Sequence, residues 1–264
     1  MQTRYKQAFN QSKAAFVPFT VLGWPDAERC YQTIKTMIDE GATALELGVA
    51  FSDPVADGPV IQQATTEVLD SGFDVEQAFR LLCRVRAYNA SVPIGLLTYL
   101  NVVLARGAEQ FFEEAARCGV DSVLIADLPP DAADEVAPHA DAHGVALVFI
   151  VSPLTTTDRL SKIAGLSKAY IYVVSRLGIT GAQETHDDQL EQLLERTKKV
   201  TAVPMLVGFG ISSPSAARNM LAIGADGVIS GSKVIEIIRQ DAAPGYPLLS
   251  RFLQDMRAAI SDKI

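Results

Sequence analysis

The sequence has few cysteines and no cysteine motif. Cys30, Cys83 and Cys118 are odd in number, and none forms the Cys-x-x-Cys spacing that is typical of metal and redox sites. All three fall in segments with helical spacing. The sequence therefore makes a metal site or a disulfide improbable and favours a reducing compartment.

The chain also lacks the features of membrane and exported proteins. No apolar run is long enough to cross a bilayer, and the first residues, Met-Gln-Thr-Arg-Tyr-Lys, are polar, unlike a signal peptide. We therefore expect a cytoplasmic protein that does not contact a membrane.

Basic residues are in the minority. There are 23 Lys and Arg residues against 31 Asp and Glu residues, a formal net charge of −8. This balance argues against nucleic acid or an anionic membrane as the main partner. An anionic small substrate remains possible, because backbone N–H groups at helix starts bind phosphate without any basic side chain.

What the sequence does contain is an alternation of short apolar runs and amphipathic segments over its 264 residues, 48% of which are hydrophobic. The apolar runs predict eight strands: Phe16–Leu22, Thr43–Gly48, Pro93–Leu100, Ser122–Asp127, Ala146–Ser152, Tyr170–Arg176, Pro204–Phe209 and Gly227–Ser232. The segments between them predict helices, among them Asp26–Glu40, Val75–Tyr88, Glu109–Cys118, Ala132–His143, Asp188–Val200 and Pro214–Ile223. This alternation indicates a parallel sheet that is covered by helices.

A weak internal repeat supports a closed barrel. Gly41, Gly119, Gly144 and Gly224 each end a helical pattern directly before an apolar run, where a left-handed residue is favoured. Eight such units predict a single (β/α)8 barrel domain over residues 1–264, with an open doubly wound sheet as the alternative. We expect an extra N-terminal helix at Gln2–Ser12, which caps the bottom of the barrel, and an extra C-terminal helix at Tyr246–Ser261.

Glu46 is a carboxylate in the middle of a predicted barrel strand. Side chains alternate faces along a strand, so Leu45 and Leu47 point towards the outer helices and Glu46 points into the barrel. Loss of water raises the pKa of a carboxyl group towards the range that is useful for proton transfer. Parity alone leaves open a barrel glutamate that is merely satisfied by hydrogen bonds.

Two further carboxylates, Asp53 and Asp57, lie in the loop that follows this strand. Each lies close to a proline, so either could be a helix cap or a turn residue. Asp57 directly precedes an expected helix start and could face Glu46 across a cavity. Two carboxylates in different surroundings can divide acid/base work between them.

Small residues also follow the last two predicted strands. Gly210 lies in Gly-Phe-Gly-Ile-Ser, and Gly231 and Ser232 lie in Ile-Ser-Gly-Ser-Lys. Barrels often bind phosphate at these two loops, where glycine lets backbone N–H groups approach an anion. We therefore favour a phosphate site over plain tight turns.

Other candidates are weaker. His139 and His143 are four residues apart but show no third ligand, so we interpret them as surface residues and predict no metal site. Asp127 ends the fourth strand and is expected to order the loop after it. Lys233 does not lie inside a strand, which weakens a Schiff-base role. The segment Leu177–Asp187 has no clear pattern and is either a mobile lid or an ordinary connection.

The motifs together resemble one family. The run from Glu46 to Gln62, the runs Pro-Ile-Gly-Leu-Leu-Thr-Tyr-Leu-Asn from Pro93 and Ser-Arg-Leu-Gly-Ile-Thr-Gly-Ala from Ser175, and the two glycine loops are similar in order and spacing to the tryptophan synthase alpha subunit. The resemblance implies a cofactor-independent retro-aldol lyase that cleaves indole-3-glycerol phosphate to indole and glyceraldehyde 3-phosphate. It also implies a beta subunit that receives the indole in an alpha2-beta2 heterotetramer.

The resemblance also assigns roles by position. Glu46 matches the acid/base glutamate, Asp57 the aspartate that stabilises the ring nitrogen, and Tyr172 an active-site tyrosine. The remaining matches are the indole pocket (Phe19, Ile61, Leu97, Tyr99, Phe209), the lid threonine (Thr180) and the phosphate site (Gly181, Gly210, Gly231, Ser232).

Three positions depart from the family's usual pattern. Ala50 replaces a proline, Trp24 an aspartate and Leu177 a smaller residue, and the first two are expected near the face that meets a beta subunit. Two alternatives therefore stay open beside an alpha subunit with its partner: a stand-alone lyase that releases free indole, and a weakly active barrel kept as an allosteric partner. The intact Glu46 and Asp57 argue against the last.

Overall fold

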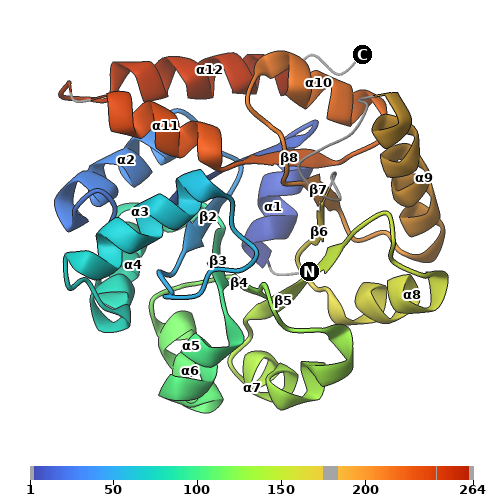
Figure 1. Cartoon of the computed structure of the whole chain (residues 1–264), viewed down its shortest axis with the longest axis horizontal. Coiled ribbons are helices and arrows are strands. Elements are labelled where there is room, and N and C mark those ends of the chain that lie inside the picture. Colours follow the sequence, from blue (N-terminus) through green and yellow to red (C-terminus); the bar gives the residue numbers. More distant parts are fainter. Residues whose placement is uncertain (1–2, 175–183, 242, 262–264) are drawn as a thin grey trace.

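The strands form a closed parallel barrel. In the computed structural model, which describes residues 3–174, 184–241 and 243–261, each strand pairs with the next and β8 pairs back onto β1 (Figure 1). The strands are β1 (Ala15–Val21), β2 (Leu45–Gly48), β3 (Ile94–Thr98), β4 (Ser122–Ile125), β5 (Ala146–Val151), β6 (Ile171–Val173), β7 (Met205–Val207) and β8 (Gly227–Ser230). The predicted (β/α)8 barrel is therefore confirmed, and closure excludes the open sheet.

Helices surround this barrel, and their apolar faces pack on the outward faces of the strands (Figure 1). They are α2 (Ala27–Asp39), α3 (Pro59–Asp70), α4 (Val75–Tyr88), α5 (Leu100–Arg106), α6 (Ala108–Arg117), η1 (Pro130–Glu135), α7 (Ala137–Ala142), α8 (Thr157–Leu166), α9 (Glu184–Val200), α10 (Pro214–Ala222), α11 (Ser232–Gln240) and α12 (Pro247–Ser261). The expected C-terminal helix is α12.

The repeated glycines take the predicted conformation. Gly41, Gly119, Gly144 and Gly224 have φ between +66° and +105°, the left-handed region that glycine enters without steric cost. Each one follows the end of a helix and turns the chain into the next strand. The repeat in the sequence therefore corresponds to one kind of helix-to-strand turn.

Two predicted segments differ in the structure. The helix expected over Ala132–His143 is split into η1 and α7 at Val136, because Pro138 in the first turn of α7 has no N–H to continue a helix from the preceding turn. The patternless segment Leu177–Asp187 ends in helix, since α9 begins at Glu184; residues 177–183 lie outside the described residues.

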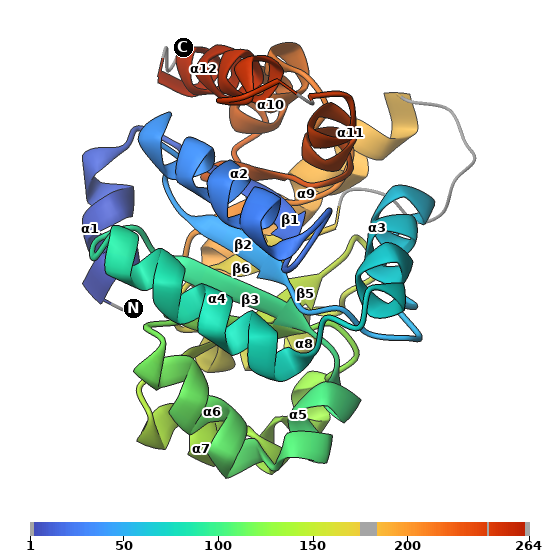
Figure 2. The same ribbon diagram turned by 90° about the vertical axis from the view of Figure 1, so that its left-hand side faces the viewer.

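Helix α1 (Thr3–Gln11) lies at the end of the barrel opposite α3 (Figure 2). The Tyr5 side chain is 1% exposed, and its hydroxyl lies 2.8 Å from Ser122 Oγ. Arg4 donates to Asp121 at 2.8 Å. The N-terminal helix therefore caps the bottom of the barrel, as predicted.

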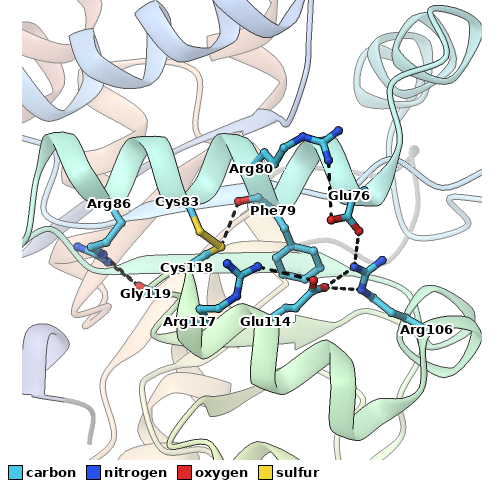
Figure 3. Close-up of a disulfide and its surroundings, with 10 residues drawn as sticks. All are labelled: Glu76, Phe79, Arg80, Cys83, Arg86, Arg106, Glu114, Arg117, Cys118 and Gly119. Carbon is cyan, nitrogen blue, oxygen red and sulfur yellow. Dashed lines mark hydrogen bonds and ion pairs between the residues drawn. A yellow bond between two sulfur atoms is a disulfide. The ribbon is translucent and has the colours of Figure 1, made fainter.

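A disulfide joins α4 to the end of α6. Cys83 lies on α4 and Cys118 directly follows α6, and their sulfur atoms are bonded across a sequence separation of 35 (Figure 3). Our expectation that a disulfide is improbable is therefore wrong. Spacing along the sequence could not show that these two helices lie side by side, with their cysteines facing each other. Cys30 is a free, buried thiol, and burial raises its pKa to about 12.

Several weaker sequence interpretations can also be checked. His139 and His143 both contact the exposed carboxylate of Glu109, at 2.6 and 2.8 Å. Asp127 was expected to order the loop after its own strand; the hydrogen bond that it accepts comes instead from the N–H of Leu100, at 2.7 Å, and fixes the start of α5 after the neighbouring strand β3. Within the described part of the chain, no cluster of three His, Cys, Asp or Glu residues could hold a metal ion, and no helix could span a membrane.

Candidate active site

One cavity of about 380 Å³ opens at the C-terminal ends of the strands. Active sites of such barrels lie at this face. Ten of the predicted site residues line it: Phe19, Glu46, Asp57, Ile61, Leu97, Tyr172, Phe209, Gly210, Gly231 and Ser232. The structure thus brings together residues that are spread over most of the sequence.

Glu46 is the buried carboxylate of this cavity. It lies on β2 opposite Phe19 of β1, faces the interior as strand parity predicts, and is 2% exposed. Burial raises its pKa to about 7 from an ordinary 4.5, the Tyr170 hydroxyl that donates to it at 2.9 Å opposes the rise, and the charge of Asp57 adds to it. A carboxyl group with this pKa can both give and accept a proton near neutral pH.

Asp57 lies in the loop between β2 and α3 and is held by Tyr99. The Tyr99 hydroxyl donates to Asp57 Oδ2 at 2.9 Å and accepts from the N–H of Ala56 at 3.1 Å. Burial raises the pKa of Asp57, and the bond from Tyr99 lowers it. The cap of α3 is Gly58 rather than Asp57, so the carboxylate is not used in capping.

Tyr99 differs from its predicted place. It is not among the residues that line the cavity; its ring stacks on Phe51 with centroids 5.1 Å apart, and its hydroxyl positions Asp57. Asp53 is exposed and accepts a hydrogen bond from the neighbouring Ser52 hydroxyl. This contact fits an ordering role in the loop.

Tyr172 forms part of the cavity wall. Its hydroxyl donates to the carbonyl of Gly208 at 3.0 Å, and burial raises its pKa well above the usual value, so it stays protonated. A Cβ atom on Gly208 would lie 2.0 Å from this hydroxyl. The place of Tyr172 therefore requires glycine at position 208.

The glycine turns after β7 and β8 also line the cavity. Gly210 has φ +76°, and Gly231 is the residue that precedes α11, whose first residue is Ser232. The Ser230 hydroxyl donates to the carbonyl of Ile211 at 2.6 Å and ties the two turns together. The free N–H groups at the start of α11 are suited to an anion.

Sequence reasoning missed several lining residues. Leu124, Ala126, Ile150, Val174, Ile211 and Ile229 complete the apolar wall. Strand parity could have identified most of them. Tyr170, which holds Glu46, and the pair Lys233 and Glu236 on α11 were also missed as site residues. The predicted Thr180 and Gly181, with the departing Leu177, lie outside the described residues.

Trp24 proves to be a packing residue. It is 1% exposed, its indole N–H donates to Glu67 Oε2 at 2.6 Å, and Arg239 pairs with the same carboxylate at 2.9 Å. This contact joins α3 to α11, the two helices that begin beside the cavity. Buried as it is, Trp24 presents almost no surface to a partner.

The closed barrel, whose cavity is lined by the buried carboxylate of Glu46, the half-buried carboxylate of Asp57 and two glycine turns, defines a (β/α)8-barrel enzyme that uses acid/base chemistry. A model of the family described as tryptophan synthase alpha chain matches residues 5–259. The chain belongs to the tryptophan synthase alpha chain family.

Individual relatives agree over nearly the whole chain. The tryptophan synthase alpha chain of Shewanella oneidensis is 42% identical, covering 97% of this chain and 95% of the relative. Among solved structures, tryptophan synthase subunit alpha from Legionella pneumophila has a TM-score of 0.90 with 28% identity over 100% of both chains. A chain of the tryptophan synthase complex from Pyrococcus furiosus has a TM-score of 0.83 with 30% identity, covering 94% of this chain and 99% of its own. The chain is a lyase of tryptophan biosynthesis that cleaves indole-3-glycerol phosphate.

Proposed function

We propose that Glu46 and Asp57 carry out the cleavage of indole-3-glycerol phosphate as a pair with divided roles. Glu46 gives its proton to the ring carbon that bears the glycerol chain, and the ring nitrogen gains positive charge. Asp57 remains ionised and stabilises that charge. The observation that carries the proposal is a buried carboxyl group with a pKa of about 7 in the same cavity as a second carboxylate.

The second half of the reaction returns the proton. Glu46, now ionised, accepts the proton of the hydroxyl group next to the ring, and the carbon–carbon bond breaks. The bonding electrons return to the ring, which leaves as indole, and the hydroxyl carbon becomes the aldehyde of glyceraldehyde 3-phosphate. The sequence is balanced without a cofactor, because Glu46 gives one proton and takes one back.

The remaining cavity residues have roles in binding. Phe19, Ile61, Leu97 and Phe209 supply an apolar surface for indole, with Tyr172 in the wall of the cavity. The phosphate is held by the N–H group of Gly210 in the turn after β7 and by those of Gly231 and Ser232 at the start of α11. The family resemblance alone assigns Thr180 as the lid threonine and Gly181 to the phosphate site, and both lie outside the described residues.

The test of the paired carboxylates is indole release from indole-3-glycerol phosphate. We expect Glu46→Gln and Asp57→Asn each to lower kcat at least about 100-fold, the lower range for a lost acid/base group, with unchanged far-UV circular dichroism. Asp53→Asn is the matched control in the same loop and should keep most activity. Near-normal turnover in Glu46→Gln or Asp57→Asn would refute that residue's role.

We further propose that a beta subunit docks at the cavity face and receives indole, in an alpha2-beta2 assembly in the cytoplasm. Val55 is 80% exposed and Leu154 74% exposed, and they lie in the loops after β2 and β5 at this face. Val55 is two residues from Asp57, so a partner that covers it would act on the catalytic loop. Indole release that is unchanged by an added beta subunit would favour the stand-alone lyase instead. Whether the protein works with a beta subunit or alone, we propose that residues 1–264 form a single barrel domain.

A further inference from the structure

Lys233 is the one basic side chain among the described residues that line the cavity. Three carboxylates share that lining: Glu46, Asp57 and Glu236. A phosphate dianion that enters so acidic a space needs positive charge close to it. Backbone N–H groups supply part of that charge, and Lys233 is placed to supply more.

Lys233 lies at a place in α11 where a positive charge is unfavourable unless an anion is bound there. It is the second residue of α11, directly after Ser232, and no acidic residue lies in the first turn of this helix. The start of a helix is its positive end, where a cation destabilises and an anion stabilises. A lysine at this point is explained if an anion joins it there.

The present partner of Lys233 holds it weakly. Its Nζ atom lies 3.4 Å from Glu236 Oε2, and the two side chains are 36% and 44% exposed. An exposed pair with this spacing contributes little to stability. The ammonium group can therefore leave Glu236 for a stronger anion at small cost, and both side chains already line the cavity.

We propose that Lys233 binds the phosphate group of the substrate, and that Glu236 competes with that phosphate for its ammonium group. This inference rests on the proposed function, because it adds a side chain to the phosphate site formed by Gly210, Gly231 and Ser232. It makes Glu236 a residue that lowers affinity for phosphorylated ligands, and Lys233 one that raises it.

The experiment measures binding of glycerol 3-phosphate by calorimetry at pH 7.5, where the phosphate is mostly a dianion, together with KM and kcat for indole-3-glycerol phosphate. Lys233→Met should raise Kd and KM about tenfold, the effect of one lost charged hydrogen bond, and leave kcat within about twofold. Lys233→Arg should restore most of the affinity. Glu236→Gln should lower the Kd for glycerol 3-phosphate, because it removes the competing carboxylate and keeps the ammonium group of Lys233.

Lys162→Met is the matched control. Lys162 pairs with Asp131 at 2.6 Å, is 48% exposed, and does not line the cavity. It should leave Kd and KM unchanged. If Lys233→Met binds glycerol 3-phosphate like the wild type while the wild type cleaves substrate, Lys233 has no part in phosphate binding and the proposed function stands. If the wild type neither cleaves substrate nor binds the phosphate, both proposals fail.

Discussion

Replacing Glu46 by glutamine should make the protein more stable at alkaline pH while it abolishes activity. Glu46 is 2% exposed, and burial raises its pKa to about 7 from an ordinary 4.5. Above pH 7 the folded protein carries a buried negative charge that the unfolded chain would hold in water. Glutamine has nearly the same shape, can still accept the bond from Tyr170, and never ionises.

The magnitude follows from the pKa shift. One pKa unit corresponds to about 1.4 kcal/mol, so ionised Glu46 lowers the free energy of unfolding by ~3.4 kcal/mol at pH well above 7. The sign follows from proton binding: between pH 4.5 and 7 the folded state holds a proton that the unfolded state has lost, so stability falls as pH rises through this window. Below pH 4.5 both states are protonated and the cost vanishes.

Urea unfolding at two pH values measures this directly. Wild type and Glu46→Gln would be compared at about pH 5 and pH 8.5, and the stability gained by the variant should be ~2.5 kcal/mol larger at the higher pH. Glu109→Gln is the contrasting control. Hydrogen bonds from His139 and His143 lower the pKa of Glu109, so its contribution is present above its usual pKa and its loss should not stabilise the protein at alkaline pH.

One outcome would refute the reasoning about Glu46. If Glu46→Gln gained as much stability at pH 5 as at pH 8.5, the cost of Glu46 would not come from its charge. The carboxyl group would then titrate near its ordinary pKa, and its assignment as a proton donor near neutral pH would lose its physical basis.

Three further predictions concern neighbouring features. Tyr170→Phe removes the hydroxyl that lowers the pKa of the catalytic glutamate, so the limb of the pH–kcat profile set by that group should move to higher pH, whereas an unmoved limb would contradict the contact. Gly208→Ala should disable the enzyme, because its Cβ atom would lie 2.0 Å from both the hydroxyl oxygen and the ring carbon Cζ of Tyr172; the additional variant Tyr172→Ala, which removes the whole ring, should recover part of the indole release, and no recovery would speak against this clash. Opening the Cys83–Cys118 bond, with reductant or by Cys83→Ser, should lower the free energy of unfolding by up to ~4 kcal/mol, the chain-entropy value for a loop of this length. Mass spectrometry that finds both thiols free in the purified protein would exclude the bond.

The barrel could be predicted because its signal repeats. Gly41, Gly119, Gly144 and Gly224 each mark the same junction, and local backbone preference sets that junction wherever it occurs. Helices α5 and α8 were not among those predicted; α5 has only seven residues, which give little periodicity to detect. The length of a strand's pairing also depends on its neighbours, which is why the described part of the sixth apolar run, residues 170–174, forms a strand over Ile171–Val173.

A site residue could be predicted where its position along its own strand determines whether its side chain points into the barrel. The parity of β2 places Glu46 inside the barrel whatever lies around it. The contacts that adjust its chemistry depend on residues far away in sequence, such as Tyr170 at 2.9 Å. The disulfide was missed for the same reason, because its two cysteines are 35 positions apart and come together only in the folded chain.

Helix α1, which caps the bottom of the barrel, also contacts the residue that holds the catalytic carboxyl group. The ring of Tyr5 packs on that of Tyr170 with centroids 5.7 Å apart, and Tyr170 donates to Glu46. The first turns of the chain therefore form the floor beneath the reacting carboxyl group, although they lie at the opposite end of the barrel from the substrate entrance. We therefore expect a shortened variant that lacks α1 to expose Tyr170 from below, and with it the hydrogen bond to the catalytic carboxyl group.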